Sequence, residues 1–271
     1  MSNLYAIILG ASSGFGKAVA LSLAKEGYHI IGVHMDRAAA LAQVEEIKQE
    51  ITSYGVKALF FNVNAADETQ RKEVVEQIKI ELTAHDDAKV QVLLHSLAFG
   101  SLKSFISDTH ANSVTQKQLE MTLDVMANSL VYWTQDVFFA GLFASGARVL
   151  SLTSAGSERN LPMYGAVSAA KSALQSYTRQ LAMELAPHKI TVNTLRAGVT
   201  DTPALRKIPG NDLLIQNALM RNPYHELTKP EHVANVVALL AKQESQWING
   251  SVIAVDGGED AVDITWWKSD N

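Results

Sequence analysis

The stretch AIILGASSGFGKAVALSLA, residues 6–24, has the order of a buried strand, a glycine-rich turn and a helix. It allows two incompatible interpretations. Gly10, Ser12 and Gly14 form the G-x-S-x-G pattern of a serine nucleophile on a sharp turn. Gly10, Gly14 and Gly16 form a G-x-x-x-G-x-G turn at the start of a helix, where backbone amides and the helix dipole attract phosphate. The rest of the chain must decide between a reacting serine and a phosphate-binding turn.

The surroundings of Ser12 do not suit a nucleophile. Such a serine needs an earlier strand–helix loop that supplies an oxyanion-hole amide, and a catalytic histidine further along the chain. Only one predicted strand precedes Ser12, and His232 falls inside a predicted helix opened by the sequence TKPE. Three glycines at such a turn can serve packing alone, but a strand, a turn and a helix start are all present. We therefore expect a phosphate-binding turn made by Gly10, Ser12, Ser13, Gly14, Phe15 and Gly16.

Short apolar runs alternate with longer amphipathic segments along the chain. The runs are typical of strands buried on both sheet faces: LYAIIL, HIIGV, KALFFNV, VQVLLHS, RVLSLTS, KITVNTL and SVIAVD. The predicted helices cover 14–26, 38–53, 67–84, 115–143, 162–186 and 230–242. This order predicts an α/β, single-domain Rossmann-like fold with a doubly wound parallel seven-stranded sheet and helices on both faces.

One dinucleotide-binding domain is expected over residues 1–271, because no repeat, low-complexity tract or linker interrupts the pattern. Val74, Val75, Ile78 and Leu82 recur at helical spacing, so their helix should cover one sheet face. The irregular segment is 197–229, which contains three prolines and the short helical piece NDLLIQNALM. Long excursions after strand ends form the substrate side in such sheets, so we expect a substrate loop or lid there.

Composition excludes several classes of function. The 271 residues are 47% hydrophobic and carry a formal net charge of −5, so a nucleic-acid partner is not expected. There is no cysteine, which excludes disulfides, thiolate metal sites and a cysteine nucleophile. No metal site is predicted. The opening apolar run is too short to span a bilayer and lacks the features of a signal peptide, so we expect a soluble cytoplasmic protein without membrane contact.

The end of the second predicted strand, GVHMDRAAA, should contact the adenosine ribose of a bound dinucleotide. Asp36 could accept a hydrogen bond from the 2′-hydroxyl of NAD, whereas Arg37 could pair with the 2′-phosphate of NADP. A third interpretation gives neither residue a role in binding, with Asp36 capping the next helix and Arg37 solvated.

Residues 149–174, VLSLTSAGSERNLPMYGAVSAAKSAL, place Tyr164 seven positions before Lys171. Positions seven apart on a helix differ by about 20° around the axis and by about 10.5 Å of rise, so the two side chains share a face. An isolated tyrosine and lysine so placed are usually an edge residue and a snorkelling charge. Here a buried strand precedes them and a phosphate-binding turn stands at the first strand, which favours a functional pair.

This segment resembles the active site of the short-chain dehydrogenase/reductase superfamily. Its Tyr-x6-Lys spacing is similar to the divergent branch that contains bacterial enoyl-acyl carrier protein reductases. The resemblance implies hydride addition to the C=C bond of an enoyl thioester, with Tyr164 hydrogen-bonding or protonating the developing enolate. Lys171 would orient the cofactor and lower the pKa of the tyrosine. Pro162 at the first helical position would place Tyr164 in the first turn.

The resemblance covers residues 5–258 and implies further cofactor contacts. The fourth, third and sixth strands would supply Ser96, Leu97, Ala98, Asn62, Val63, Gly198, Thr200 and Thr202. His34 stands at the usual acidic position of the second strand and Arg37 follows closely, which favours NADPH while NADH stays possible. The last strand packs between subunits in tetrameric relatives, so a homotetramer is expected.

Two departures from the family pattern concern the chemistry. Ser154 stands ten residues before Tyr164, where many enoyl reductases carry a second tyrosine, and seventeen before Lys171, where the superfamily has its catalytic serine. Ser154 is thus a candidate active-site donor, or a satisfied hydroxyl at a strand end. The superfamily's helical asparagine is replaced by Met126, since Asn128 is expected to project elsewhere.

The sequence thus predicts NAD(P)H-dependent reduction of trans-2-enoyl thioesters, free or carrier-bound, in fatty-acid synthesis. The first alternative, favoured by Ser154, is a carbonyl reductase of the same superfamily, such as a 3-oxoacyl reductase or hydroxysteroid-type dehydrogenase. A second alternative is a cofactor-sensing binding protein on a decayed reductase scaffold.

Overall fold

Seven parallel strands form one sheet in a computed structural model that describes residues 3–262. The strands are β1 (Leu4–Leu9), β2 (His29–His34), β3 (Ala58–Asn62), β4 (Lys89–His95), β5 (Phe143–Ser154), β6 (Thr191–Ala197) and β7 (Val252–Val255). Their spatial order is β3-β2-β1-β4-β5-β6-β7, and all six neighbouring pairs are parallel. The predicted doubly wound sheet is confirmed. The strand order reverses between β1 and β4, where open parallel sheets bind ligands.

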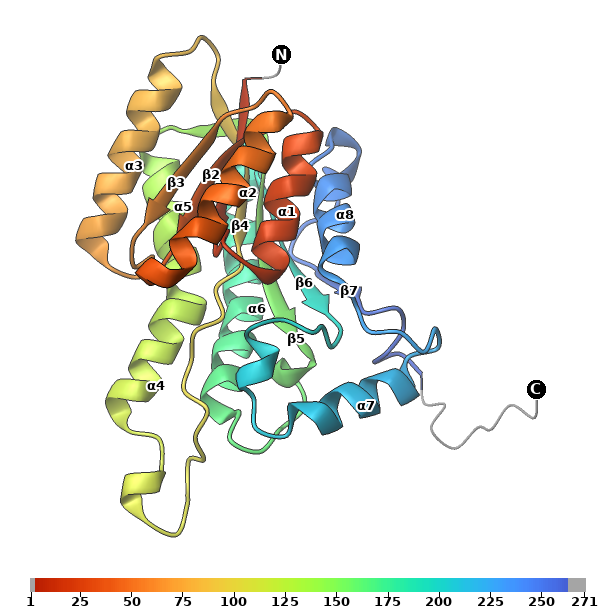
Figure 1. The fold of residues 1–271 in the computed structure, drawn as a ribbon. Coiled ribbons are helices and arrows are strands. Elements are labelled where there is room, and N and C mark those ends of the chain that lie inside the picture. The colour runs from red at the N-terminus through yellow and green to blue at the C-terminus, as the bar shows by residue number, and fades with distance from the viewer. Residues whose placement is uncertain (1–2, 263–271) are drawn as a thin grey trace.

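Helices cover both faces of the sheet (Figure 1). They are α1 (Gly14–Lys25), α2 (Leu41–Ser53), α3 (Glu68–Thr83), α4 (Gln116–Leu123), α5 (Ser129–Phe139), α6 (Gly165–Leu185), α7 (Asn211–Arg221) and α8 (Pro230–Leu240). One apolar core lies under α3, α5 and α6, and the other under α1, α2 and α8. The predicted apolar stripe of α3, from Val74 to Leu82, belongs to the first core alone, as its spacing predicts.

The predicted helix over 115–143 is wrong in its middle and at its end. α4 and α5 are separated by a π-helical turn, Asp124–Asn128, in which the Asp124 carboxylate accepts a hydrogen bond from the Tyr132 hydroxyl at 2.9 Å. A left-handed Gly141 (φ 71°) follows α5, and β5 already begins at Phe143. Inserted π turns are frequent at functional sites.

The helix predicted over 162–186 begins later, so Pro162 is not its first residue. Met163 adopts a left-handed conformation with φ of 59°, which a helix cannot include. Tyr164 is consequently the N-cap residue of α6, which starts at Gly165. The chain is thus turned sharply just before the candidate catalytic tyrosine.

The loops that follow the strands gather at one end of the sheet. In Figure 1, α4 and α7 lie beyond the sheet, on the side toward which the arrows of β5 and β6 point. The segment 197–229 contains α7 and a short 3₁₀ turn, Leu205–Lys207. This arrangement places the predicted substrate loop at the carboxyl ends of the strands.

Candidate active site

The glycine turn after β1 is as tight as its spacing predicts. Gly10 is left-handed (φ 91°), and a β-carbon there would lie 2.5 Å from the carbonyl oxygen of Ser96 at the end of β4. A β-carbon on Gly16 would lie 2.1 Å from the carbonyl oxygen of Gly10, so α1 packs directly on the turn. Ser13 is the N-cap residue of α1, and within the described chain its side chain makes no capping bond. The first amides of the helix are therefore available to an anion.

A cavity of about 450 Å³ opens at this turn and extends to the ends of β5 and β6. Most of the residues that the sequence singles out line it: Gly10, Ser12, Ser13, Gly14, Phe15, His34, Ser96, Leu97, Ala98, Ser154, Tyr164, Lys171, Gly198, Thr200 and Thr202. Of the residues that the structure describes, five other candidate cofactor contacts lie outside the lining: Gly16, Asp36, Arg37, Asn62 and Val63. Segments distant in the sequence thus meet around one volume.

The end of β2 is built around the His34 and Asp36 side chains. His34 Nδ1 lies 2.9 Å from Asp36 Oδ2, and Asn62 fixes the same turn through hydrogen bonds to both backbone polar groups of Asp36. The interpretation that Asp36 caps the next helix is wrong, since Arg37 holds the N-cap position of the 3₁₀ turn Ala38–Ala40. Arg37 is exposed and forms no ion pair with any described residue, so its guanidinium is free to bind a phosphate.

Tyr164 and Lys171 both reach the cavity from the start of α6. Lys171 is buried, its Nζ donates a hydrogen bond to the Leu152 carbonyl at 2.7 Å, and burial lowers its pKa to about 8. Burial raises the pKa of Tyr164, and the nearby Ser154 hydroxyl opposes this only in part. The expected lowering of the tyrosine pKa by Lys171 is wrong in this structure, because burial dominates. Tyr164 is therefore protonated at neutral pH and can donate a hydrogen bond.

Ser154 lies at the end of β5 with its hydroxyl facing the site. Its Oγ is buried and makes no hydrogen bond of standard geometry among residues 3–262, although it lies close enough to the Tyr164 hydroxyl to oppose the rise of that pKa. A buried hydroxyl without a partner is rare and marks a position where a ligand can supply the missing bond. The satisfied strand-end hydroxyl, which the sequence left as an alternative, is not observed.

His95, at the end of β4, is a site residue that the sequence interpretation missed. Its Nε2 lies 2.8 Å from Ser129 Oγ, and burial together with the nearby Lys171 lowers its pKa to about 3. It is therefore neutral, and it links the end of β4, next to the cavity-lining Ser96, to Ser129 of α5. Met126 lines the cavity from the π turn, whereas the Asn128 amide oxygen accepts a hydrogen bond from Tyr177 at 2.9 Å. Asn128 thus projects away from the site, as predicted.

Much of the remaining wall of the cavity is apolar, although Thr153, Lys207 and Glu259 also line it. Three separate segments supply the apolar side chains, namely the loop after β4, the loop before α6 together with the first turn of this helix, and the 197–229 segment: Phe99, Leu102, Leu161, Val167, Leu205, Ile208 and Leu214. The sequence predicted a substrate loop at 197–229 but gave no sign of a pocket in it. An apolar wall beside a few polar groups suits an acyl chain or another apolar substrate.

Comparison with known proteins identifies the family. A family model described as Enoyl-(Acyl carrier protein) reductase matches residues 10–259, which is most of the chain. The chain belongs to this family of short-chain dehydrogenases/reductases. A 3-oxoacyl-(acyl-carrier-protein) reductase from Thermotoga maritima is 27% identical over 252 residues, which cover 93% of this chain and 96% of the relative.

Solved structures show the same fold. An enoyl-(acyl-carrier-protein) reductase (NADH) from Aquifex aeolicus is 21% identical, with a TM-score of 0.81 and coverage of 95% of this chain and 96% of the other. The angucycline C-6 ketoreductase LanV, solved with bound NADP, is 22% identical, with a TM-score of 0.83 and coverage of 96% and 97%. The similar proteins reduce different bonds, so membership in this reductase family gives an oxidoreductase class without giving the substrate.

The cavity of this short-chain reductase fits a nicotinamide dinucleotide. The glycine turn offers amides to a pyrophosphate, the β2 end offers polar groups to a ribose, and the buried Lys171 and the unpartnered Ser154 stand at the far end. No group of three metal-binding side chains occurs within residues 3–262. In that same range, no helix has both the length and the apolar character needed to cross a bilayer.

Proposed function

We propose that this reductase uses NAD(P)H to reduce the C=C bond of trans-2-enoyl thioesters. The observation that carries the proposal is the seven-residue spacing of Tyr164 and Lys171 in the wall of one cavity, with the phosphate-binding turn at its other end. The longer spacing moves the phenol one helical turn further from the lysine than a four-residue spacing does. A distant phenol suits a substrate whose reacting carbon and activated oxygen are separated by two carbons.

The roles of the side chains follow from their environments. A nicotinamide cofactor, when bound, would supply the hydride that the β-carbon of the enoyl thioester accepts. Tyr164, protonated because burial raises its pKa, donates a hydrogen bond to the thioester oxygen as negative charge develops there. A proton taken from solvent would then add to the α-carbon and complete the saturated product. Ser154, whose Oγ lacks a partner in the described chain, supplies a second donor, and Lys171 holds the ribose of the cofactor.

A comparison of two substrates tests the proposal. NAD(P)H oxidation followed by absorbance should proceed with crotonyl thioester and hardly with acetoacetyl thioester. The second candidate function, carbonyl reduction, is favoured by the unpartnered Ser154 Oγ beside Tyr164, and it predicts the reverse preference. A cofactor-sensing binding protein without catalysis predicts turnover with neither substrate.

We further propose NADPH as the preferred cofactor, with Arg37 pairing with its 2′-phosphate. The support is an exposed guanidinium beside a β2 end whose one acidic side chain, Asp36, is already held by His34. Arg37→Ala should raise the KM for NADPH about tenfold, the usual order for a charge-assisted hydrogen bond, and leave the KM for NADH unchanged. Arg179→Ala, at an exposed arginine of α6, is the matched control. An unchanged NADPH preference in Arg37→Ala removes this residue from the account.

The pH dependence of cofactor binding should follow Lys171. Its pKa is lowered to about 8, while that of His95 is lowered to about 3 and that of Tyr164 is raised above 10. Lys171 is thus the member of this group that titrates between pH 7 and 9, and its loss of charge should weaken cofactor binding as pH rises through about 8. Nicotinamide fluorescence titrations between pH 6.5 and 9.5 measure this, and a constant affinity across that range contradicts it.

Stability should change in the opposite direction over the same pH range. The pKa of Lys171 is lower in the folded chain than its usual value of 10.5, so the unfolded chain binds more protons between the two values. This lysine therefore makes folding more favourable as pH rises from about 8 to 10.5. A loss of cofactor affinity above pH 8 therefore cannot be explained by unfolding that the titration of Lys171 causes.

We also propose that the chain is one reductase domain with residues 197–229 as its substrate loop, acting as a cytoplasmic homotetramer. The single sheet and the position of α7 over the cavity support the first two points. Exposed apolar side chains beside β7, including Trp247 at 97% exposure, support association between subunits. Light scattering on the purified protein measures the subunit number.

A further inference from the structure

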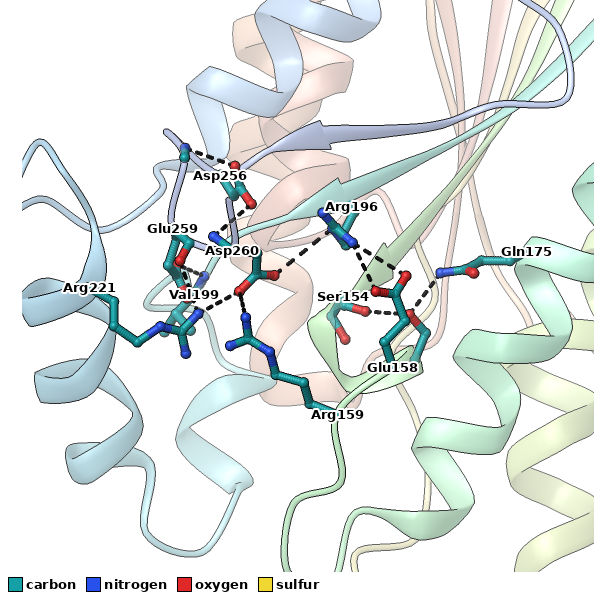
Figure 2. Close-up of polar contacts among 12 residues, drawn as sticks. Ser154, Glu158, Arg159, Gln175, Arg196, Val199, Arg221, Asp256, Glu259 and Asp260 are labelled. Carbon is teal, nitrogen blue, oxygen red and sulfur yellow. Dashed lines mark hydrogen bonds and ion pairs between the residues drawn. The ribbon is translucent and has the colours of Figure 1, made fainter. Parts of the chain in front are cut away.

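Two neighbouring carboxylates, Glu259 and Asp260, follow the last strand and contact several of the segments that surround the cavity. Glu259 is 3% exposed, and the side chain of Asp260 is 8% exposed. Buried carboxylates are normally paired, because an isolated buried charge is costly. Figure 2 shows that each of the two has its own partners. The proposed reaction gives neither of them a role.

Asp260 joins three arginines from different parts of the fold. Its Oδ1 lies 2.6 Å from Arg221 Nη2 and 2.8 Å from Arg159 Nη2, and its Oδ2 lies 4.0 Å from Arg196 Nε. Arg221 is the last residue of α7, Arg159 lies in the loop between β5 and Tyr164, and Arg196 lies in β6 (Figure 2). One carboxylate therefore connects α7 to the sheet and also to the loop between β5 and Tyr164, which we call the tyrosine loop.

Two of the three arginines depend on Asp260 as their acidic partner. Arg196 also pairs with Glu158, whose side chain is 58% exposed, whereas neither Arg159 nor Arg221 contacts another acidic side chain in the described chain. Removing the Asp260 charge leaves two guanidinium groups close together, and Glu259, whose charge still attracts Arg221, offsets their repulsion only in part. Their repulsion should separate α7 from the tyrosine loop, because like charges near one another in a partly buried site disfavour the compact arrangement.

Glu259 holds the neighbouring cavity wall. Its carboxylate accepts a hydrogen bond from the Val199 N–H at 3.0 Å, and the residue lines the cavity. A β-carbon on Gly198 would lie 2.4 Å from Thr228 Oγ1 and 2.8 Å from Glu259 Oε2, so both side chains would have to shift if residue 198 were not glycine. Burial raises the pKa of Glu259, as expected for a carboxyl group closed in by the wall. The segment it holds runs into Thr200, one of the proposed cofactor contacts.

We propose that Glu259 and Asp260 form a positioning pair, in which Asp260 holds α7 against the tyrosine loop and Glu259 fixes the 198–200 segment against the cofactor. Two adjacent residues thus position the substrate side and the cofactor side of one cavity relative to each other. This inference rests on the proposed function, because it takes the cavity as the joint site of cofactor and substrate. Neither carboxylate need touch a reacting atom.

Hydrogen exchange on the full chain without ligands tests the role of Asp260. Asp260→Asn should accelerate amide exchange about tenfold in residues 155–163 and 211–221 and leave the β-sheet amides unchanged, as expected of local opening. Arg221→Gln should accelerate exchange in 211–221. Glu45→Gln, which removes the exposed partner of Lys48 in α2, is the control and should change neither segment. Unchanged exchange in Asp260→Asn, or equal acceleration throughout the sheet, overturns the proposal.

Cofactor titration tests the role of Glu259 through a conservative variant. Glu259→Ala removes the acceptor of the Val199 N–H and should weaken NADPH and NADH binding about fivefold, the order of one buried hydrogen bond. Glu259→Gln keeps an acceptor oxygen and should restore the affinity. Equal weakening by both variants overturns the proposal. Local opening without reduction of either thioester leaves the positioning pair intact and refutes the proposed function, so the two failures are distinguishable.

Discussion

Tyr164→Phe should lower kcat with crotonyl thioester by at least about a hundredfold, the range found for loss of a positioned proton donor. The phenol is buried in the cavity wall and protonated at neutral pH, so the substitution removes one donor and keeps the ring packing. Cofactor affinity should stay within about threefold of the original protein, because Tyr164 is assigned to the substrate oxygen and not to a charged group of the cofactor. Steady-state kinetics and nicotinamide fluorescence measure the two quantities.

Tyr177→Phe is the matched control for this substitution. Tyr177 lies on the same helix, and its hydroxyl donates to the Asn128 amide at 2.9 Å, away from the cavity lining. Its activity should stay near that of the original protein. Equal losses in the two variants would show that the phenol acts through the packing of α6 and not through the substrate. Full activity in Tyr164→Phe would remove the tyrosine from the mechanism.

Gly16→Ala should abolish measurable cofactor binding and lower the melting temperature. The added β-carbon would lie 2.1 Å from the Gly10 carbonyl oxygen, which belongs to the backbone of the turn and cannot move without opening it. Overpacking of this kind costs about 1–3 kcal/mol, which corresponds to a fall in Tm of about 2–5 °C for a chain of this size. Displacement of the turn also removes the amides that bind the pyrophosphate. Calorimetry and fluorescence titration measure both effects.

Gly55→Ala separates this steric effect from the general cost of replacing a glycine. Gly55 has a left-handed φ of 79°, and a β-carbon there meets no atom of the described chain within 4 Å. It should cost about 1 kcal/mol of backbone strain and leave cofactor binding unchanged. If Gly16→Ala binds cofactor as well as Gly55→Ala does, the turn is not the pyrophosphate site.

The sheet could be predicted from the sequence because its signals are local. Runs such as LYAIIL and VQVLLHS are apolar over the length of a buried strand, and the stripe from Val74 to Leu82 repeats at helical spacing. The start of α6 was misplaced because the left-handed turn at Met163 depends on the surrounding loop and not on a residue preference. The π turn at Asp124–Asn128 likewise involves a side-chain contact with Tyr132 that no periodicity reveals.

The site residues that belong to recognisable motifs could be predicted from the sequence. Those that only the fold brings together could not. Tyr164 and the glycine turn have recognisable spacings, and the structure places both at one cavity. Asp260 follows a common strand-and-turn pattern, but its three arginines come from positions 39 to 101 residues away along the chain. His95 reads as part of an apolar run, and only its burial beside Ser129 shows that it supports the site.

The preference between two thioesters measures most directly what this protein does. With the purified protein and either NADPH or NADH, the proposed function predicts a kcat/KM for crotonyl thioester at least about tenfold above that for acetoacetyl thioester. Tyr164→Phe should remove the crotonyl activity in the same assay. A higher kcat/KM for acetoacetyl thioester would instead identify a carbonyl reductase in which Ser154 and Tyr164 act on a ketone.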